Sequence, residues 1–138
     1  MLCEQFMPKS ANIRTFNECC SVLVAEDNKT SQLIVDFYLK EFGASTKIVF
    51  DGDALLAALE ADSFDVVIVD AMMLILDGVN AIEIIRKKKL HDNKPIILLT
   101  ADAVGVARGK YRKLPIQAVL TKPYTKNELF ETISSVVL

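Results

Sequence analysis

The strongest constraint on the fold is a set of five short apolar runs, rich in β-branched residues, that recur along the chain. They are Ser21–Ala25, Thr46–Phe50, Asp65–Val69, Pro95–Leu99 and Ala118–Thr121. Three of these runs are apolar almost throughout and do not alternate with polar residues. That pattern is typical of strands buried on both faces, as in a parallel sheet.

Helical patterns separate the five runs. Apolar residues recur at helix spacing in four segments, and a capping box formed by Thr125 and Glu128 opens a fifth. The fourth segment is the weakest, because two glycines interrupt the pattern from Val104 through Tyr111 to Leu114. Strand and helix therefore alternate five times, which indicates an α/β fold with helices on both faces of a parallel sheet.

The alternation also divides the chain. We assign residues 1–20 to an N-terminal extension or linker and residues 21–138 to one domain of common size. No apolar stretch reaches the roughly 20 residues of a membrane span, and the first residues lack the apolar core of a signal peptide. We therefore expect a cytoplasmic protein.

Charge and rare residues narrow the function further. The net charge of -2 gives no electrostatic case for direct binding of nucleic acid. The three cysteines, Cys3, Cys19 and Cys20, are a poor disulfide framework and have no partner at metal-ligand spacing. The one histidine, His91, lies in the polar stretch KKKLHDNK, so we expect a solvated loop residue there.

Chemically capable side chains follow four of the five runs. They are Glu26 and Asp27 after the first, Asp70 after the third, Thr100 after the fourth and Lys122 after the fifth. Ligands bind outside the carboxyl ends of the strands in open parallel sheets, where all five would meet. Any one of them could merely finish a strand or cap a helix, as Asp27 could cap the first helix. Five at one edge favour a binding or catalytic site.

The chemistry of such a cluster is restricted. Three neighbouring carboxylates repel each other, and either a divalent cation or the ammonium of Lys122 would relieve that repulsion. Mg²⁺ suits the site, because it prefers oxygen ligands and keeps waters that a phosphate can displace. A carboxylate that attacks phosphorus, with Mg²⁺, Lys122 and the Thr100 hydroxyl around the phosphoryl oxygens, would perform phosphoryl transfer.

Four motifs, in this order, resemble the receiver domain of two-component response regulators. They are AEDN at Ala25–Asn28, VDAMMLILDG at Val69–Gly78, LTAD at Leu99–Asp102 and LTKP at Leu120–Pro123. The resemblance covers residues 21–138. It implies a flavodoxin-like (βα)5 three-layer sandwich with strand order 2-1-3-4-5. It also implies a signalling phosphoacceptor that catalyses only its own phosphorylation and dephosphorylation, and not an enzyme acting on other substrates.

The resemblance assigns roles around the expected metal. Asp70 would be the phosphoacceptor and would take a phosphoryl group from a phosphohistidine on a histidine kinase or phosphotransfer domain. Asp27, Asp70 and the backbone carbonyl of Met72 would bind Mg²⁺, and Glu26 would act on the metal through water.

The resemblance also assigns roles around the expected phosphoryl group. Thr100 and Lys122 would hold its oxygens, and the Lys122–Pro123 peptide bond would be cis. Phosphorylation would pull Thr100 inward and shift the face made by the helix near residues 104–114, the strand 118–121 and the last helix. A homodimer through that same face is a further expectation.

Three positions depart from the family pattern. Leu74 stands where the family usually has proline, Val119 where it has an aromatic residue, and Pro115 where it has glycine. Tyr111 and Tyr124 do not occupy the aromatic position. We therefore hypothesise that the switch is weak in this chain or works differently.

The sequence also has to be compared with three alternative functions, which are a pseudo-receiver, a phosphatase and a nucleotide binder. A pseudo-receiver, which binds partners without phosphorylation, is kept open by Val119 and Pro115. A phosphatase acting on small substrates is disfavoured, because Met72 stands where such enzymes carry a second aspartate. A P-loop nucleotide binder is excluded by its missing motif. The chain could be a stand-alone regulator or a piece of a hybrid kinase, and the AEDN motif leans toward the hybrid.

Overall fold

The computed structural model describes residues 20–73 and 76–137. Strands and helices alternate through these two ranges. The elements are β1 (Ser21–Ala25), α2 (Lys29–Glu41), β2 (Ser45–Val49), α3 (Gly52–Ala61), β3 (Val66–Asp70), α4 (Gly78–Lys87), β4 (Ile96–Thr100), α5 (Ala103–Ala107), β5 (Ala118–Thr121) and α6 (Lys126–Val137). The five predicted strands are therefore confirmed, each within one residue of its predicted position.

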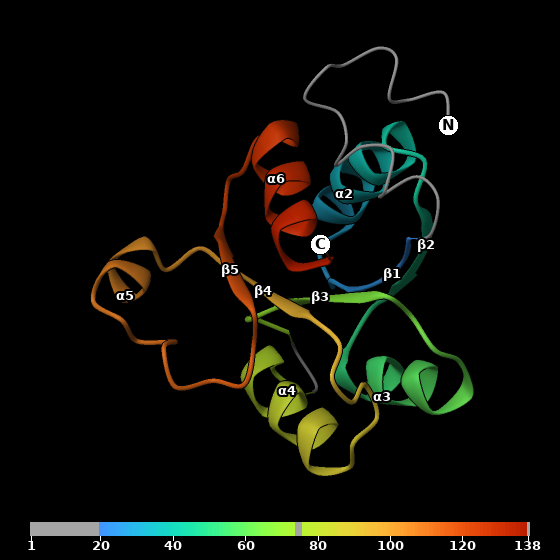
Figure 1. The fold of residues 1–138 in the computed structure, drawn as a ribbon. Helices are drawn as coiled ribbons and strands as arrows, with labels where there is room; N and C mark the ends of the chain where they lie inside the picture. Colours follow the sequence, from blue (N-terminus) through green and yellow to red (C-terminus); the bar gives the residue numbers. More distant parts are fainter. Residues whose placement is uncertain (1–19, 74–75, 138) are drawn as a thin grey trace.

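The strands form one parallel sheet in the order β2-β1-β3-β4-β5. Helices α2 and α6 cover one face, α3 and α4 cover the other, and α5 lies beside the β5 edge (Figure 1). This arrangement confirms the predicted three-layer sandwich and its strand order. Every crossover that joins neighbouring strands runs through a helix, which is how parallel strands are connected.

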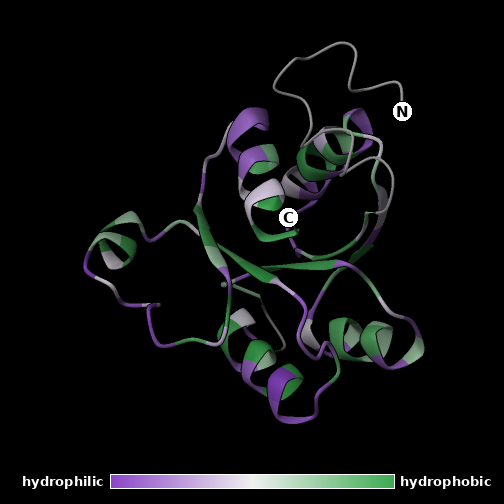
Figure 2. Cartoon of the chain, in the orientation of Figure 1, coloured by the Kyte–Doolittle hydropathy of each residue, from purple (hydrophilic) through white to green (hydrophobic). Residues whose placement is uncertain are grey.

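Two hydrophobic cores lie on the two faces of the sheet. On one face, Leu55 of α3 and Ile82 of α4 pack against the sheet; on the other, Leu39 of α2 and Leu129 of α6 do so. All five residues of β3 and of β4 are buried. Figure 2 shows the hydrophobic colouring gathered on the strands and on the helix sides that face them. The unbroken apolar runs of the sequence thus correspond to strands covered on both faces.

The helix ends follow local rules. The Asn28 side chain accepts from the Ser31 N–H and caps α2, so the alternative role of Asp27 as that cap is wrong. The predicted capping box is confirmed, because the Thr125 and Glu128 side chains each accept from the backbone N–H of the other. Asp27 is consequently left at the edge of the sheet.

The prediction for the fourth helix was wrong in length. The helix α5 ends at Ala107, and Tyr111 and Leu114 lie in the turns that follow it. Gly109 adopts a φ of 78°, which other residues rarely adopt and which takes the chain out of the helix. Both apolar side chains still pack into the core on the α3–α4 face, so their spacing reflected burial and not a helix.

The prediction for His91 was also wrong. Its side chain is only 3% exposed, and its Nε2 lies 2.9 Å from the Pro95 carbonyl oxygen. Arg86 Nη1 donates to the His91 carbonyl at 2.6 Å, which fixes the turn around it. Burial lowers the pKa of His91, so its neutral form is favoured.

Some predictions fall outside the described residues. These are the disulfide and metal arguments for Cys3 and Cys19, the family departure at Leu74, and nearly all of the proposed extension at residues 1–20. The division into an extension and a domain at residue 21 therefore stays a prediction. Within residues 20–73 and 76–137, no helix is long and apolar enough to cross a membrane.

Candidate functional site

The sheet brings the predicted site residues to one edge. Asp70 is the last residue of β3 and Thr100 the last of β4, while Glu26 follows β1 directly. The register pairs Ala25 with Val69 and Asp70 with Leu99, so these strand ends lie side by side. Glu26, Asp70 and Thr100 are all buried at this edge, where rigid strands hold them.

An acidic cluster forms at this edge. Carboxylate oxygens of Glu26, Asp27 and Asp70 all lie within 4.8 Å of one another. Glu26 and Asp70 are buried, and Asp27 is half-buried. Oxygen ligands at this spacing fit a hard cation such as Mg²⁺, which needs only one or two carboxylates and keeps its remaining waters. The donor set therefore fits the ion that the sequence predicted.

Lys122 reaches the cluster from the end of β5. Its Nζ lies 2.8 Å from Glu26 Oε1 and 3.2 Å from Asp70 Oδ2. Its backbone N–H donates to the Thr100 carbonyl, which fixes the start of the loop after β5. The Lys122–Pro123 peptide bond is cis, as the resemblance implied. One ammonium thus faces two buried carboxylates, and the cluster retains excess negative charge.

Two pKa values record this electrostatic arrangement. Burial and the neighbouring Asp70 raise the pKa of Glu26 to about 7, against the opposing influence of Lys122. Burial by itself would lower the pKa of Lys122, but the hydrogen bond to Glu26 and the charge of Asp70 raise it above its ordinary value. The lysine therefore remains charged, whereas the glutamate is close to its titration point near neutral pH. Such shifts are common at functional sites.

The loop after β3 is held closely against the phosphoacceptor candidate. The Met72 N–H donates to Asp70 Oδ1 at 3.2 Å, and the Gly78 N–H donates to the Ala71 carbonyl. A Cβ on Gly78 would lie 2.9 Å from Ala71 Cα and closer still to the Asp70 carbonyl. Only glycine permits this approach. Gly78 at the end of the motif therefore serves the position of Asp70.

Several residues that support the site were not identified from the sequence. The Asn28 N–H donates to Glu26 Oε2 at 3.2 Å, and Gln32 Nε2 donates to the Glu26 carbonyl at 2.5 Å. Both lie on or just before α2, so helix spacing after the AEDN motif was the available signal for Gln32. Tyr111 and Asp102 also reach the site, through Thr100.

The comparison with known families agrees with this geometry. A profile described as the response regulator receiver domain matches residues 22–134. The chain belongs to the response regulator receiver domain family. Such domains are signalling modules of two-component systems, and receiver domains bind Mg²⁺ at an acidic pocket. The fold, the strand order and the acidic cluster of this receiver domain all agree with that membership.

Among curated proteins, this receiver domain is similar to segments of much longer chains. It is 30% identical over 119 residues to the transcription factor SKN7 of Saccharomyces cerevisiae, covering 86% of this chain and 19% of that protein. It is 31% identical over 115 residues to the sensor protein GacS of Pseudomonas syringae pv. syringae, covering 81% of this chain and 13% of that protein. The chain thus spans about a fifth or less of these relatives.

Solved structures show the same likeness. The receiver domain of a Francisella response regulator is 30% identical, with a TM-score of 0.78, and the match covers 86% of this chain and 96% of that one. The receiver domain of a sensor histidine kinase from Pseudomonas aeruginosa PAO1 is 27% identical, with a TM-score of 0.79, covering 86% and 98%. That second structure is described with a magnesium ion coordinated in its active-site cleft.

Proposed function

We propose that this chain is a working phosphoacceptor, in which Asp70 takes a phosphoryl group from a phosphohistidine of a partner protein in the presence of Mg²⁺. The observation that supports it best is the cluster of Glu26, Asp27 and Asp70 with Lys122 at hydrogen-bond distance. A pseudo-receiver has no need to hold three carboxylates within 4.8 Å of one another at a cost in repulsion.

The proposed roles follow from the geometry. Asp27, Asp70 and the Met72 carbonyl would hold Mg²⁺, with Glu26 acting through a bound water, and the ion would neutralise charge on the phosphoryl oxygens. An Asp70 carboxylate oxygen forms a bond to phosphorus while the bond from phosphorus to the histidine nitrogen breaks, and that nitrogen keeps the electron pair. The strand ends hold Asp70 in place, so little reorganisation is required.

Lys122 and Thr100 complete the proposed site. Lys122 already contacts Asp70 Oδ2, so it can follow the developing charge on the phosphoryl oxygens with a small movement of a flexible side chain. Thr100 ends the neighbouring strand β4 and carries a single hydroxyl proton to donate. Hydrolysis of the acyl phosphate returns the free carboxylate and ends the signal.

The proposed partner is a histidine kinase or a histidine phosphotransfer domain. Support comes from the surface beside the site, where α2 begins two residues after Asp27. The side chains of Leu33, Ile34 and Phe37 on α2 are exposed, and so is Met72 after β3. Exposed apolar patches often mark protein–protein contact surfaces. Such a partner could cover the edge while its phosphohistidine meets Asp70.

The proposed output face consists of α5, β5 and α6. Its rearrangement on phosphorylation, and the pairing of two copies through it, stay predictions. Sedimentation of the chain with and without a phosphodonor tests the pairing, and an unchanged sedimentation coefficient would contradict it.

Intact mass after incubation with acetyl phosphate and Mg²⁺ tests the proposed function. We expect a gain of one phosphoryl group, about 80 Da, that disappears with a chelator and in the Asp70→Asn variant. Asp77→Asn is a matched control, because Asp77 caps α4 and lies seven residues beyond Asp70. A mass that does not change, together with undetectable Mg²⁺ binding, would favour the pseudo-receiver.

A further inference from the structure

Tyr111 joins the proposed phosphorylation site to the segment that follows α5. The side chain is buried, although the residue lies in a turn between α5 and β5. Its hydroxyl oxygen lies 3.2 Å from Thr100 Oγ1 and 3.2 Å from Asp102 Oδ2. One side chain therefore contacts the last residue of β4 and the N-terminal cap of α5 at once.

The hydrogen atoms of this network can be assigned by counting donors. The Asp102 carboxylate only accepts, and it receives bonds from Gly105 N–H, Lys110 Nζ and the Tyr111 hydroxyl. These donors hold the pKa of Asp102 below its ordinary value, so the carboxylate stays ionised. The single proton of Tyr111 is thus donated to Asp102, because a bond to a charged acceptor is the stronger one.

The hydroxyl proton of Thr100 can then also be assigned to one hydrogen bond, the one to the Tyr111 oxygen. Thr100 Oγ1 accepts from the Asp102 N–H at 3.0 Å, so its own proton remains for the Tyr111 oxygen. The role proposed for Thr100 in phosphoryl binding needs that same proton, directed toward Asp70. A threonine hydroxyl has one proton and cannot donate it in both directions.

We propose that Tyr111 competes with the phosphoryl group on Asp70 for the hydroxyl proton of Thr100, and thereby couples phosphorylation to α5 and the turns after it. This inference rests on the proposed function. A phosphoryl oxygen carries charge and is the stronger acceptor, so phosphorylation turns the Thr100 hydroxyl away from Tyr111. Tyr111 then keeps Asp102 as a partner and loses its direct bond to the sheet.

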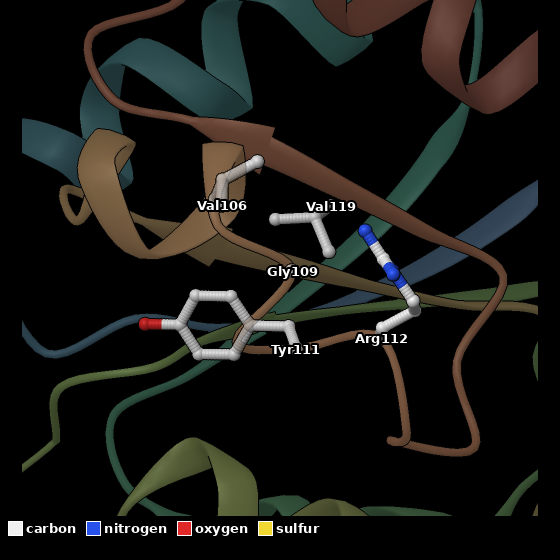
Figure 3. Close-up of a pocket in the computed structure, with 5 residues that line it drawn as sticks. All are labelled: Val106, Gly109, Tyr111, Arg112 and Val119. Atoms are coloured by element: carbon white, nitrogen blue, oxygen red, sulfur yellow. The ribbon is translucent and has the colours of Figure 1, made fainter.

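The surroundings of the ring allow it to move after that loss. A hollow of about 170 Å³ lies beside Tyr111 and is lined by Val106, Gly109, Arg112 and Val119 (Figure 3). Val119 is small and Gly109 has no side chain, so neither fills the space next to the ring. The valine that departs from the family pattern thus leaves room for a tyrosine that comes from a different element.

Loss of the bond between Tyr111 and Thr100 also affects α5 and the segment that follows it. Asp102 caps α5, and Tyr111 anchors the chain that runs from Arg108 to the start of β5. Breaking the bond between Tyr111 and Thr100 loosens this segment from β4, while a ligand bound to the segment that favours the released ring would in turn favour phosphorylation. Tyr111 is a positioning residue in this scheme, since it acts on the phosphoryl group only through Thr100.

The test uses the full 138-residue chain with Mg²⁺ and a titration with beryllofluoride, a phosphate mimic, followed by amide chemical shifts. In the wild type, we expect shifts at Asp70 and also throughout residues 101–116. In Tyr111→Phe the competing acceptor is absent, so the midpoint should fall about threefold to tenfold. The amides of residues 103–116 should respond less than in the wild type. Acetyl phosphate should likewise give a higher steady-state level of phosphorylated chain.

Two further variants separate this coupling from a simple loss of stability. Tyr38→Phe makes the same chemical change on α2, where the ring packs against Tyr124, and should leave the midpoint unchanged. Val119→Leu fills part of the hollow without placing an aromatic ring there, restricts the movement of Tyr111, and should raise the midpoint. Thermal unfolding of each variant shows whether it is folded during the titration.

The outcomes are distinct. Equal midpoints and equal shifts in the wild type and Tyr111→Phe, with both phosphorylated, would overturn the coupling and leave the proposed function intact. A folded Val119→Leu chain with the wild-type midpoint would also count against the coupling. A wild type that takes up neither beryllofluoride nor a phosphoryl group would overturn the proposed function, and the coupling with it.

Discussion

The two ends of the sheet treat their buried polar groups in opposite ways. At the amino end, Arg86 donates to the carbonyls of Pro115, His91 and Lys94, and also to Gln117 Oε1. The Gln117 side chain also accepts from a strand N–H at the start of β4. Each of these polar groups has a partner within the protein, so the network is complete by itself.

At the carboxyl end of the sheet, the charges of the buried polar groups are not balanced by partners within the described part of the protein. Glu26, Asp27 and Asp70 lie together, and Lys122 is the cation that contacts two of them. Their mutual repulsion reduces the stability of the metal-free fold, and a bound cation would offset it. The comparison shows that hydrogen-bond partners within the protein distinguish the two kinds of buried polar group. Polar groups whose partners all come from the protein, such as Arg86, stabilise the fold. Carboxylates whose negative charge is not balanced by the protein, such as those of the acidic cluster, are available to bind a ligand.

The largest effect is expected from a substitution that breaks the hydrogen-bond network of Arg86. Arg86→Met removes four hydrogen bonds and leaves the carbonyls around it without this donor, so we expect the free energy of unfolding to fall by about 3 kcal/mol. Urea unfolding measures this loss. Lys87→Met, the neighbouring exposed cation, is the matched control and should change it by less than about 0.5 kcal/mol. Equal losses in both variants would contradict the assigned role of Arg86.

The next largest effect is expected when Mg²⁺ binds to the acidic cluster and offsets its negative charge. A cation that binds only the folded chain stabilises it by RT ln(1 + [L]/Kd), so Mg²⁺ at about thirty times Kd should add about 2 kcal/mol. Calorimetric melting with Mg²⁺ and with a chelator, at equal ionic strength, measures the shift in Tm. The shift should shrink as pH falls below about 7, because Glu26 becomes protonated and the excess negative charge of the cluster is reduced. A shift that is the same at low and at high pH would argue against this charge-driven account.

A smaller effect relieves the repulsion without a metal. Asp27→Asn removes one of the three carboxylate charges, so the metal-free chain should gain about 0.5–1 kcal/mol while losing its response to Mg²⁺. Thermal melts with and without Mg²⁺ give both quantities. Asp36→Asn, which changes a carboxylate paired with Lys40 on the surface of α2, should leave the Mg²⁺ response intact. A destabilised Asp27→Asn chain would show that this charge supports the fold.

The smallest effect concerns pH at the amino end. Burial, with Arg86 and Lys94 nearby, lowers the pKa of His91 in the folded chain, whereas Asp65 and the Pro95 carbonyl oppose that shift. The unfolded chain takes up a proton near pH 6.5, but the folded chain resists it until lower pH, so stability present above about 6.5 is lost as pH falls.

His91→Gln isolates this contribution. The variant keeps a donor for the Pro95 carbonyl and cannot titrate, so its unfolding free energy should fall less steeply between about pH 7 and pH 5 than that of the wild type. Parallel pH profiles for the two proteins would show that His91 takes no part in the pH dependence.

The elements that the sequence predicted well are those with local causes. Apolar runs rich in β-branched residues placed every strand within one residue, and the Thr125 box placed the start of α6. The fourth helix and His91 were misjudged because their environments depend on distant residues. Tyr111 packs beneath a turn that Gly109 creates, and His91 is enclosed when Arg86 binds the carbonyls around it.

The candidate site also has features that the sequence predicted and features that depend on tertiary contacts. The sequence by itself determined which groups lie at the carboxyl edge, because a parallel sheet must bring the ends of its strands together. The cap of α2 was a local choice between two neighbours, and the structure shows that Asn28 makes it through Ser31, which leaves Asp27 beside Asp70. Only the tertiary structure brought Tyr111 to Thr100, because contacts between segments depend on how the chain packs in three dimensions and no local pattern encodes them.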